Sequence, residues 1–182
     1  DYRQFLETPL PVPAQGLTLD IQSGTGIGQL VRQLQQQPGL SRPAIYLEAY
    51  ARLNGLASRL KAGEYALTPG LTPRALLDRI VAGRVIQYPL TIVEGWTFRQ
   101  LRQALMAHPR LVQTLSGLSD AEVMARLGRP GEHPEGWFLP DTYHFPAGFT
   151  DEAFLRRARA AMDQRLREIW DRRAPDAPVN DP

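Results

Sequence analysis

The sequence contains no cysteine among its 182 residues. This absence excludes disulfides, thiolate zinc sites, iron–sulfur clusters and cysteine nucleophiles, so packing and hydrogen bonding have to stabilise the fold. Histidine is also scarce, because only His108, His133 and His144 occur. Their spacing does not match that of a helical pair of metal ligands, which lie about four residues apart. We therefore expect neither a metal centre nor another cofactor.

An excess of charge of one sign is also missing. The chain has 21 basic and 19 acidic residues, a net charge of +2, and Lys61 is its single lysine. Such a small imbalance indicates no dense basic surface, so we do not expect a nucleic-acid partner. The hydrophobic content of 43% supports one or two small globular units with proper cores.

Long hydrophobic runs are absent as well. No apolar stretch approaches the roughly 18 residues that a membrane-spanning helix needs. The chain starts at Asp1 with neither an initiator methionine nor a signal peptide. We therefore expect further sequence upstream of Asp1.

Hydrophobic periodicity predicts a strand, two helices and a second strand over residues 17–68. Apolar residues alternate over 17–21, as in a half-buried strand, and recur with helical spacing over 27–34. A second helix is expected around 46–50, preceded by Ser41 and Pro43 and ended near Asn54-Gly55, and a strand over 63–68. A further helix is predicted to have Thr72 as its cap and to end at Gly83. Together, residues 17–84 are predicted to form one small module.

A mixed α/β part is expected over residues 85–173. A strand over 85–93 leads to two helices that begin with capping boxes, Thr97 with Gln100 and Ser119 with Glu122. From Thr150 a long amphipathic helix of about five to six turns is predicted. Its expected apolar face contains eight residues, Phe154, Leu155, Ala158, Ala161, Met162, Leu166, Ile169 and Trp170. Its arginines, Arg156, Arg157, Arg159, Arg165 and Arg167, are expected to form a solvated face.

The two ends of the chain are predicted to be irregular. Residues 1–16 contain Pro9, Pro11 and Pro13 with few periodic apolar positions, so we expect an extended lead-in. Residues 174–182 have no periodicity and are expected to be a linker that is cut short. The fold class that follows is α+β, with a β-α-α-β module before a mixed α/β part that ends in a long helix.

One segment between the last two predicted helices concentrates chemistry-bearing side chains. It contains two carboxylates, a hydroxyl and three aromatic rings among turn-forming residues, namely Glu135, Gly136, Trp137, Phe138, Pro140, Asp141, Thr142 and Tyr143. Polysaccharide sites use such groups, because aromatic faces stack on sugars and carboxyls can donate protons or accept hydrogen bonds. Two alternatives remain open from the residues alone. The segment could be a structural corner, or Glu135 and Asp141 could be a self-contained hydrolase pair.

Residues 135–143 resemble the signature of the endolytic murein transglycosylases, the MltG or YceG-like family, which ends in Pro-Asp-Thr-Tyr. Residues 61–65 and the pair Glu94-Gly95 resemble further elements of that family, in the same order. The resemblance implies a LysM-like glycan-binding module over residues 17–84 and an incomplete YceG-like catalytic domain over 85–173.

The same resemblance implies that the catalytic residue is not in this chain. In that family the acid/base glutamate lies in a later helix with the run Ala-Ser-Ile-Val-Glu-Lys-Glu, which does not occur here. We therefore assign no catalytic residue. The signature residues, Glu135, Gly136, Trp137, Pro140, Asp141, Thr142 and Tyr143, are carried over as groove or scaffold positions, together with Glu94.

The function implied by the resemblance is part of a lytic transglycosylase. Such an enzyme cleaves nascent peptidoglycan strands endolytically, leaves 1,6-anhydroMurNAc ends and terminates strand elongation, whereas this fragment alone is expected to be inactive. The implied partners are peptidoglycan strands and peptidoglycan synthases. The implied location is the bacterial inner membrane, with a single-pass anchor upstream of Asp1 and the remainder in the periplasm. The alternative is a non-catalytic periplasmic module that binds glycan or acts as a scaffold.

Overall fold

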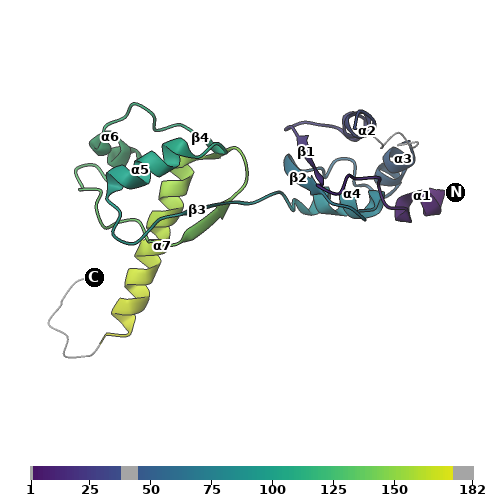
Figure 1. Ribbon diagram of the computed structural model, residues 1–182. Helices are drawn as coiled ribbons and strands as arrows, with labels where there is room; N and C mark the ends of the chain where they lie inside the picture. The colour runs from purple at the N-terminus through teal and green to yellow at the C-terminus, as the bar shows by residue number, and fades with distance from the viewer. Residues whose placement is uncertain (1, 38–44, 174–182) are drawn as a thin grey trace. The chain divides into compact units, whose positions relative to one another are not determined.

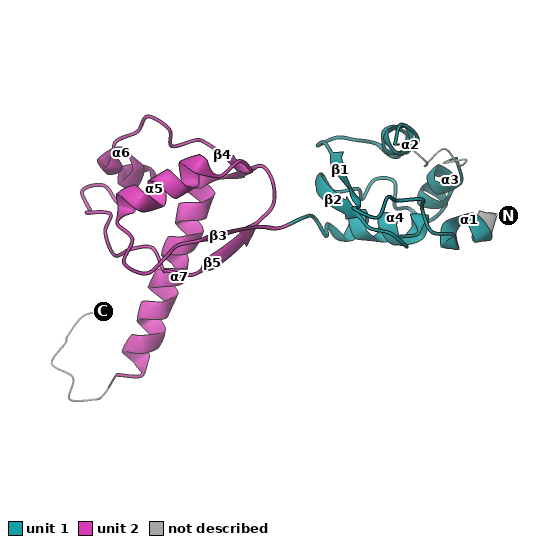
Figure 2. Cartoon of the chain, viewed as in Figure 1, with its two compact units in different colours: residues 1–86 teal, residues 87–182 magenta. Residues whose placement is uncertain are grey.

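The computed structural model describes residues 2–37 and 45–173, and the chain divides into two compact units, residues 1–86 and 87–182 (Figure 2). Helices combine with small two-stranded sheets in both units. The expected α+β class is therefore confirmed. Ser41, Pro43 and the expected linker over 174–182 lie outside the described residues.

Unit 1 contains the predicted strand, helix, helix and strand in that order. They are β1 (Leu17–Ile21), α2 (Ile27–Gln35), α3 (Ile45–Leu53) and β2 (Gly63–Leu67) (Figure 1). The two strands pair antiparallel, with Leu19 opposite Tyr65, and both of these residues are buried. Because alternate strand positions face one side of a sheet, this pairing presents one apolar face to the helices.

Helix α4 (Pro73–Ala82) completes the core of unit 1, and both of its ends form as expected. The Thr72 hydroxyl accepts a hydrogen bond from the Ala75 amide at 3.2 Å, and Gly83 ends the helix in the left-handed region at φ 72°. Its buried face consists of Pro73, Leu76, Leu77 and Ile80. The chain then returns to the sheet, since the Ile86 amide donates to the Glu64 carbonyl at 2.7 Å.

The extended lead-in expected over residues 1–16 is wrong for its first part. Residues Tyr2–Glu7 form helix α1, which lies ahead of the prolines that begin at Pro9. Leu6 is buried and Phe5 packs against the core of unit 1. Burial of these two side chains stabilises a turn and a half of helix that local periodicity over so few residues does not reveal.

Unit 2 contains three helices and four short strands of the predicted mixed α/β part among its described residues. They are β3 (Tyr88–Thr91), α5 (Phe98–Ala107), β4 (Leu111–Val112), α6 (Asp120–Arg126), β5 (Thr142–Phe145), β6 (Phe149–Thr150) and α7 (Asp151–Asp171). Strands β3 and β5 pair antiparallel, and β4 and β6 pair parallel. Both predicted capping boxes are present, at Thr97 and Ser119.

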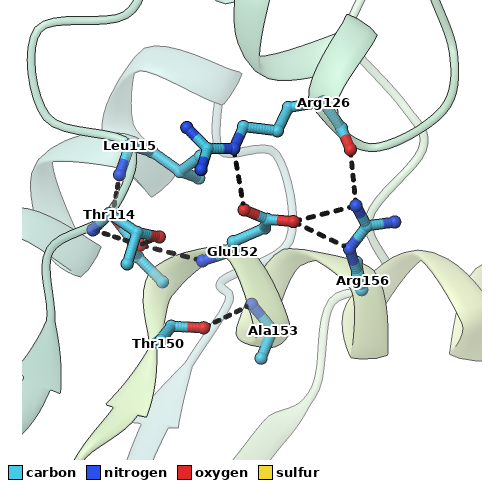
Figure 3. A network of polar contacts seen from close by, with 8 residues as sticks. Thr114, Leu115, Arg126, Thr150, Glu152, Ala153 and Arg156 are labelled. Carbon is cyan, nitrogen blue, oxygen red and sulfur yellow. Dashed lines mark hydrogen bonds and ion pairs between the residues drawn. The ribbon is translucent and has the colours of Figure 1, made fainter.

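Helix α7 begins where it was predicted and is held there by polar contacts. The Thr150 hydroxyl accepts from the Ala153 amide at 3.0 Å, and Glu152 lies between the guanidinium groups of Arg126 and Arg156 (Figure 3). Arg156 also donates to the Arg126 carbonyl. These contacts join the first turn of α7 to the end of α6.

The expected apolar face of α7 is buried only over its first half. Phe154, Leu155 and Ala158 are fully buried, whereas Leu166 is 37% exposed and Ile169 is 55% exposed. The predicted apolar face is therefore buried over the first half of the helix only, because the core of unit 2 does not reach its second half. The expected solvated face is wrong at Arg159, which is buried.

Candidate functional site

The signature segment begins by closing the amino-terminal end of helix α5. Both carboxylate oxygens of Glu135 accept from the Phe98 amide, Oε1 at 3.0 Å and Oε2 at 2.9 Å. Phe98 is the first residue of the helix, so its amide has no partner within the helix. Glu135 therefore supplies a negatively charged acceptor at the positive end of the helix dipole.

Apolar contacts attach the next part of the segment to the same helix and to α7. The ring of Phe138 stacks on that of Phe98 with centroids 5.3 Å apart, and Phe138 is buried. The Leu139 amide donates to the Ala158 carbonyl of α7 at 3.2 Å. The segment is thus a corner that joins the start of α5 to the middle of α7.

The second half of the signature pairs with strand β3. The hydroxyls of Thr142 and Thr91 lie 2.8 Å apart on the exposed face, and the Ile92 amide donates to the Asp141 carbonyl at 2.9 Å. The carboxylate of Asp141 is exposed and accepts from the Thr142 amide at 2.7 Å. Asp141 and Thr142 therefore have local partners in and beside the strand.

Tyr143 is a buried member of the corner. Its hydroxyl donates to the Leu139 carbonyl at 2.8 Å, and its ring meets that of Phe154 edge-on at 5.2 Å. Burial raises the pKa of Tyr143 to about 12; the negative charge of Asp141 adds to this shift and Arg157 opposes it. Tyr143 is consequently neutral at physiological pH and acts as a hydrogen-bond donor inside the corner.

A groove of about 240 Å³ lies beside this corner. Residues from 92–98 line one part of it, including Trp96 and Phe98, and residues from 134–140 line another, including Glu135. Met162 of α7 also contributes. The groove therefore brings together two segments that are about 40 positions apart in the sequence.

The expected site residues divide into two groups around this groove. Glu135, Gly136 and Pro140 line it. The other five expected residues are not among its lining residues, although all lie in or next to the lining segments, namely Glu94, Trp137, Asp141, Thr142 and Tyr143. Glu135 is the one carboxylate of the groove lining, and its oxygens are engaged by the Phe98 amide.

Trp96 is a lining residue that the sequence interpretation missed. A signal for it exists, because the tripeptide Glu-Gly-Trp occurs twice, at 94–96 and at 135–137. The glycines of both copies have positive φ, 81° at Gly95 and 85° at Gly136. Both copies therefore make a tight turn that places a tryptophan after it.

Each unit also contains a further hollow. One of about 260 Å³ in unit 2 is lined by Arg129, Trp137, Asp163, Leu166 and Arg167. The other, of about 320 Å³, lies in unit 1 between the loop after β1, residues 22–26, and the loop before β2, residues 57–62. Its polar lining comes from Gln22, Ser23, Thr25 and Ser58 and from backbone at two glycines.

Neither a metal cluster nor a membrane-spanning helix is present in the part of the chain that the structure describes. Over residues 2–37 and 45–173, no three histidine, aspartate or glutamate side chains converge as metal ligands. No helix in those ranges combines the length and the apolar character needed to cross a bilayer.

Comparison with known proteins supplies the family. The model of the YceG-like family matches residues 19–181, which is most of both units. The chain belongs to the YceG-like family. No curated protein matches the sequence.

A solved structure of a YceG-like protein from Listeria monocytogenes is similar to this chain at 22% sequence identity, with a TM-score of 0.39. The similarity covers 87% of this chain and 58% of that protein, so this YceG-like chain spans less than two thirds of the length of the solved one.

The groove of this YceG-like chain has side chains suited to bind and orient a sugar. None of its lining residues is arranged as a proton donor. Trp96 offers an aromatic face for a sugar ring, and the apolar lining around it favours the C–H faces of carbohydrates. General acid catalysis needs a carboxyl with a proton directed at the leaving oxygen. Glu135 instead accepts a hydrogen bond through both oxygens, as a helix cap does.

Proposed function

We propose that this chain is the glycan-binding part of an endolytic murein transglycosylase of the MltG type. The parent enzyme would cleave nascent peptidoglycan strands, form 1,6-anhydroMurNAc ends and so terminate strand elongation. The observation that carries the proposal is the groove beside the family signature, which combines Trp96 with Glu135 and an apolar wall. Membership of the YceG-like family supports the same reaction class.

In the proposed enzyme, the residues of this chain position the glycan and exclude water from the reacting sugar. A lytic transglycosylase protonates the glycosidic oxygen, which leaves the anomeric carbon as the hydroxyl of the next sugar. The 6-hydroxyl of the same MurNAc sugar attacks that carbon and gives its proton to the carboxylate that served as the acid. Water must be kept from that carbon, and an apolar groove wall does so. Glu135 is a positioning residue, because its carboxylate fixes the start of α5 and thereby the turn that carries Trp96.

The cellular setting follows from the same proposal. The parent protein would be held in the bacterial inner membrane by a single-pass anchor, with the two units in the periplasm. Peptidoglycan strands would be its substrate and peptidoglycan synthases its protein partners.

A digestion assay tests the assignment of the catalytic residue. Purified peptidoglycan incubated with the 182-residue chain should yield no 1,6-anhydro products, because no residue of the groove is arranged as a proton donor. Release of such products, abolished by Glu135→Gln but not by Glu94→Gln, would show that Glu135 is the acid after all.

A binding assay tests the groove itself. Chitin-type oligosaccharides should shift the Trp96 indole signal in a two-dimensional NMR spectrum, and Trp96→Ala should weaken binding about tenfold because a stacked aromatic face is lost. Trp170→Ala is the matched control, since Trp170 lies near the end of α7 and does not line the groove. Equal affinity of both variants would argue against glycan binding in this groove.

The hollow of unit 1 favours a second binding role. It lies between two loops of the β-α-α-β module and presents hydroxyls and glycine backbone, which suit hydrogen bonding to sugar hydroxyls. We propose that this module is LysM-like and binds glycan there. Titration with chitin oligomers should move the amide signals of residues 22–26 and 57–62. If those signals stay in place, the module is a spacer.

A further inference from the structure

One wall of the groove is irregular backbone that has to be held by its neighbours. Residues 134–140 form neither helix nor strand. The residues of this wall that line the groove are Pro134, Glu135, Gly136, Phe138 and Pro140. A segment without a regular ladder of hydrogen bonds takes its position from the contacts that surround it. The shape of the groove therefore depends on what holds this wall.

Helix α7 holds the wall through two consecutive residues. The Ala158 carbonyl accepts from the Leu139 amide at 3.2 Å. The guanidinium of Arg159 lies over the indole ring of Trp137, with its Cζ atom 4.7 Å from the ring centroid. Trp137 does not line the groove, although both of its neighbours in the sequence do. Its ring thus attaches the wall to α7 without occupying the space of the groove.

The contact between Arg159 and Trp137 is shielded from water. Arg159 is buried, and Trp137 packs against the core of unit 2. A cation over an aromatic face is attracted to the ring, and the attraction is larger for a desolvated pair than for an exposed one. This contact can therefore contribute to the position of the wall.

Two carboxylates fix the guanidinium of Arg159. Glu132, in the loop before the wall, lies 3.4 Å from it, and Asp163, one turn further along α7, lies 3.9 Å from it. A planar guanidinium pairs with carboxylates at its edge while its face lies on an aromatic ring, which the ammonium group of a lysine cannot do. Arg159 therefore joins the loop before the wall, the wall itself and α7.

We propose that Arg159 is a positioning residue that acts through Trp137 to hold residues 134–140 in place as one wall of the groove. The inference rests on the proposed function and deepens it, because it names a residue that orders this wall before a glycan binds. Arg159 does not line the groove, so its effect on a ligand is indirect. Without it the ligand would have to order the wall, and ordering on binding lowers affinity.

Titration of the 182-residue chain with a chitin-type oligosaccharide tests the inference through the Trp96 indole signal. Arg159→Met retains much of the side-chain length but removes the charge and the planar group, so it should weaken binding about three- to tenfold. Arg159→Lys keeps the charge and should bind with intermediate affinity. Arg173→Met is the matched control and should bind as the parent chain does. Arg173 lies 3.8 Å from the ring centroid of Trp170, but it is exposed and does not line the groove.

Two further variants separate positioning from stability. Val123 is fully buried in unit 2 and does not line the groove. Val123→Ala should therefore lower the unfolding midpoint and leave the affinity of the folded chain unchanged. Trp137→Phe completes a double-mutant cycle with Arg159→Met. If Arg159 acts through Trp137, the double variant should bind about as well as Arg159→Met alone.

Hydrogen exchange at the Phe98 amide tests the wall without a ligand. The Glu135 carboxylate of the wall accepts from that amide. A less ordered wall in Arg159→Met should therefore speed its exchange about three- to tenfold. The Glu122 amide, which donates to the Ser119 hydroxyl in α6, is the internal control and should exchange at an unchanged rate.

Three results would overturn the inference while the proposed function stands. They are equal affinity of Arg159→Met and the parent chain, an equal loss of affinity in Val123→Ala, and additive effects of the substitutions at Arg159 and Trp137. If the parent chain binds no oligosaccharide, the proposed function fails, and exchange at Phe98 decides the inference. Faster exchange in Arg159→Met then supports a wall held by Arg159, and an unchanged rate overturns it.

Discussion

The two units bury different kinds of side chain. The described core of unit 1 consists of hydrophobic residues, whereas unit 2 also buries two charged ones, Asp151 at 3% and Arg159 at 6% exposure. Unit 2 also contains the groove beside the signature segment. The free-energy cost of burying charged groups is therefore concentrated in unit 2. Buried charges are tolerated only when they are paired or fully hydrogen bonded.

Remote carboxylates have a repeated role in unit 2. Glu135 accepts from the amide of Phe98, and Asp151 accepts from the amide of Thr114, both across 37 positions of sequence. Each contact fixes an irregular backbone segment to a helix terminus. In unit 1 the backbone is instead held by the pairing of β1 with β2 along their whole length.

The comparison can be tested first in the hydrophobic core. Leu77→Ala in unit 1 should lower the free energy of unfolding by about 2–5 kcal/mol, because Leu77 is fully buried and its truncation leaves a cavity. Hydrogen exchange at the β1 and β2 amides measures this effect. Leu53→Ala is the control, since Leu53 is 81% exposed, and it should change stability by less than about 0.5 kcal/mol.

The same variant shows whether the units are independent. All three tryptophans, Trp96, Trp137 and Trp170, lie in unit 2, so tryptophan fluorescence follows unit 2 alone. Leu77→Ala should leave that unfolding transition unchanged. A fluorescence midpoint that falls together with the exchange protection of β1 would mean that the units unfold as one.

The buried carboxylate of unit 2 gives the next largest effect. Asp151 accepts from the Thr114 amide at 2.8 Å, from the Thr114 hydroxyl at 2.6 Å and from the Leu115 amide at 3.1 Å. Asp151→Asn retains the shape but replaces an acceptor by a donor, so it should destabilise unit 2 by about 3 kcal/mol. Urea unfolding followed by tryptophan fluorescence measures this loss. Asp171→Asn, at the exposed end of α7, should leave the midpoint unchanged.

Most helices of both units could be predicted because their signals are local. Thr72, Thr97, Ser119 and Thr150 each accept from a backbone amide three residues later, and a sequence shows that spacing directly. Strands β4 and β6 have two residues each, too few to show a period. The exposure of the second half of α7 could not be predicted for a different reason. Periodicity marks an apolar face, but it does not show how far the core extends along that face.

The contacts made by the residues of the candidate segment could not be predicted from the sequence. The segment 135–143 was recognised, yet the partner of Glu135 is the Phe98 amide, 37 positions away, and no local pattern reveals such a contact. The burial of Arg159 under Trp137 depends in the same way on the path of the corner over α7. Long-range polar contacts are what a single sequence does not show.

Removal of the helix cap formed by Glu135 should lower the stability of unit 2 moderately. Glu135→Ala removes the acceptor for the Phe98 amide and should cost about 0.5–2 kcal/mol in unit 2, as the loss of other helix caps does. Glu135→Gln keeps one oxygen as an acceptor and should cost less. Fluorescence-detected unfolding compares both with Glu94→Ala, an exposed Glu-Gly position for which no loss is expected. Equal losses at Glu94 and Glu135 would remove the distinction between the two copies of the tripeptide.

The smallest expected effect concerns the buried tyrosines, one in each unit. Burial raises the pKa of Tyr65 in unit 1, and it raises that of Tyr143 in unit 2 from 10.0 to about 12. A folded-state pKa above the unfolded value means that the folded protein keeps a proton that the unfolded chain has lost. The contribution of Tyr143 is therefore complete below pH 10 and decreases as the pH rises from 10 towards 12, and that of Tyr65 likewise decreases as the pH rises above 10.

Tyr143→Phe isolates this effect in unit 2. At neutral pH it should cost about 1 kcal/mol, because the hydrogen bond to the Leu139 carbonyl is lost. Above pH 10 its deficit relative to the parent chain should shrink, since phenylalanine has no proton to lose there. Other groups that titrate at high pH are common to both chains and cancel in the difference. Tyr65→Phe should leave the fluorescence-detected pH profile of unit 2 unchanged, and a deficit of Tyr143→Phe that stays constant across this range would contradict the burial of its hydroxyl.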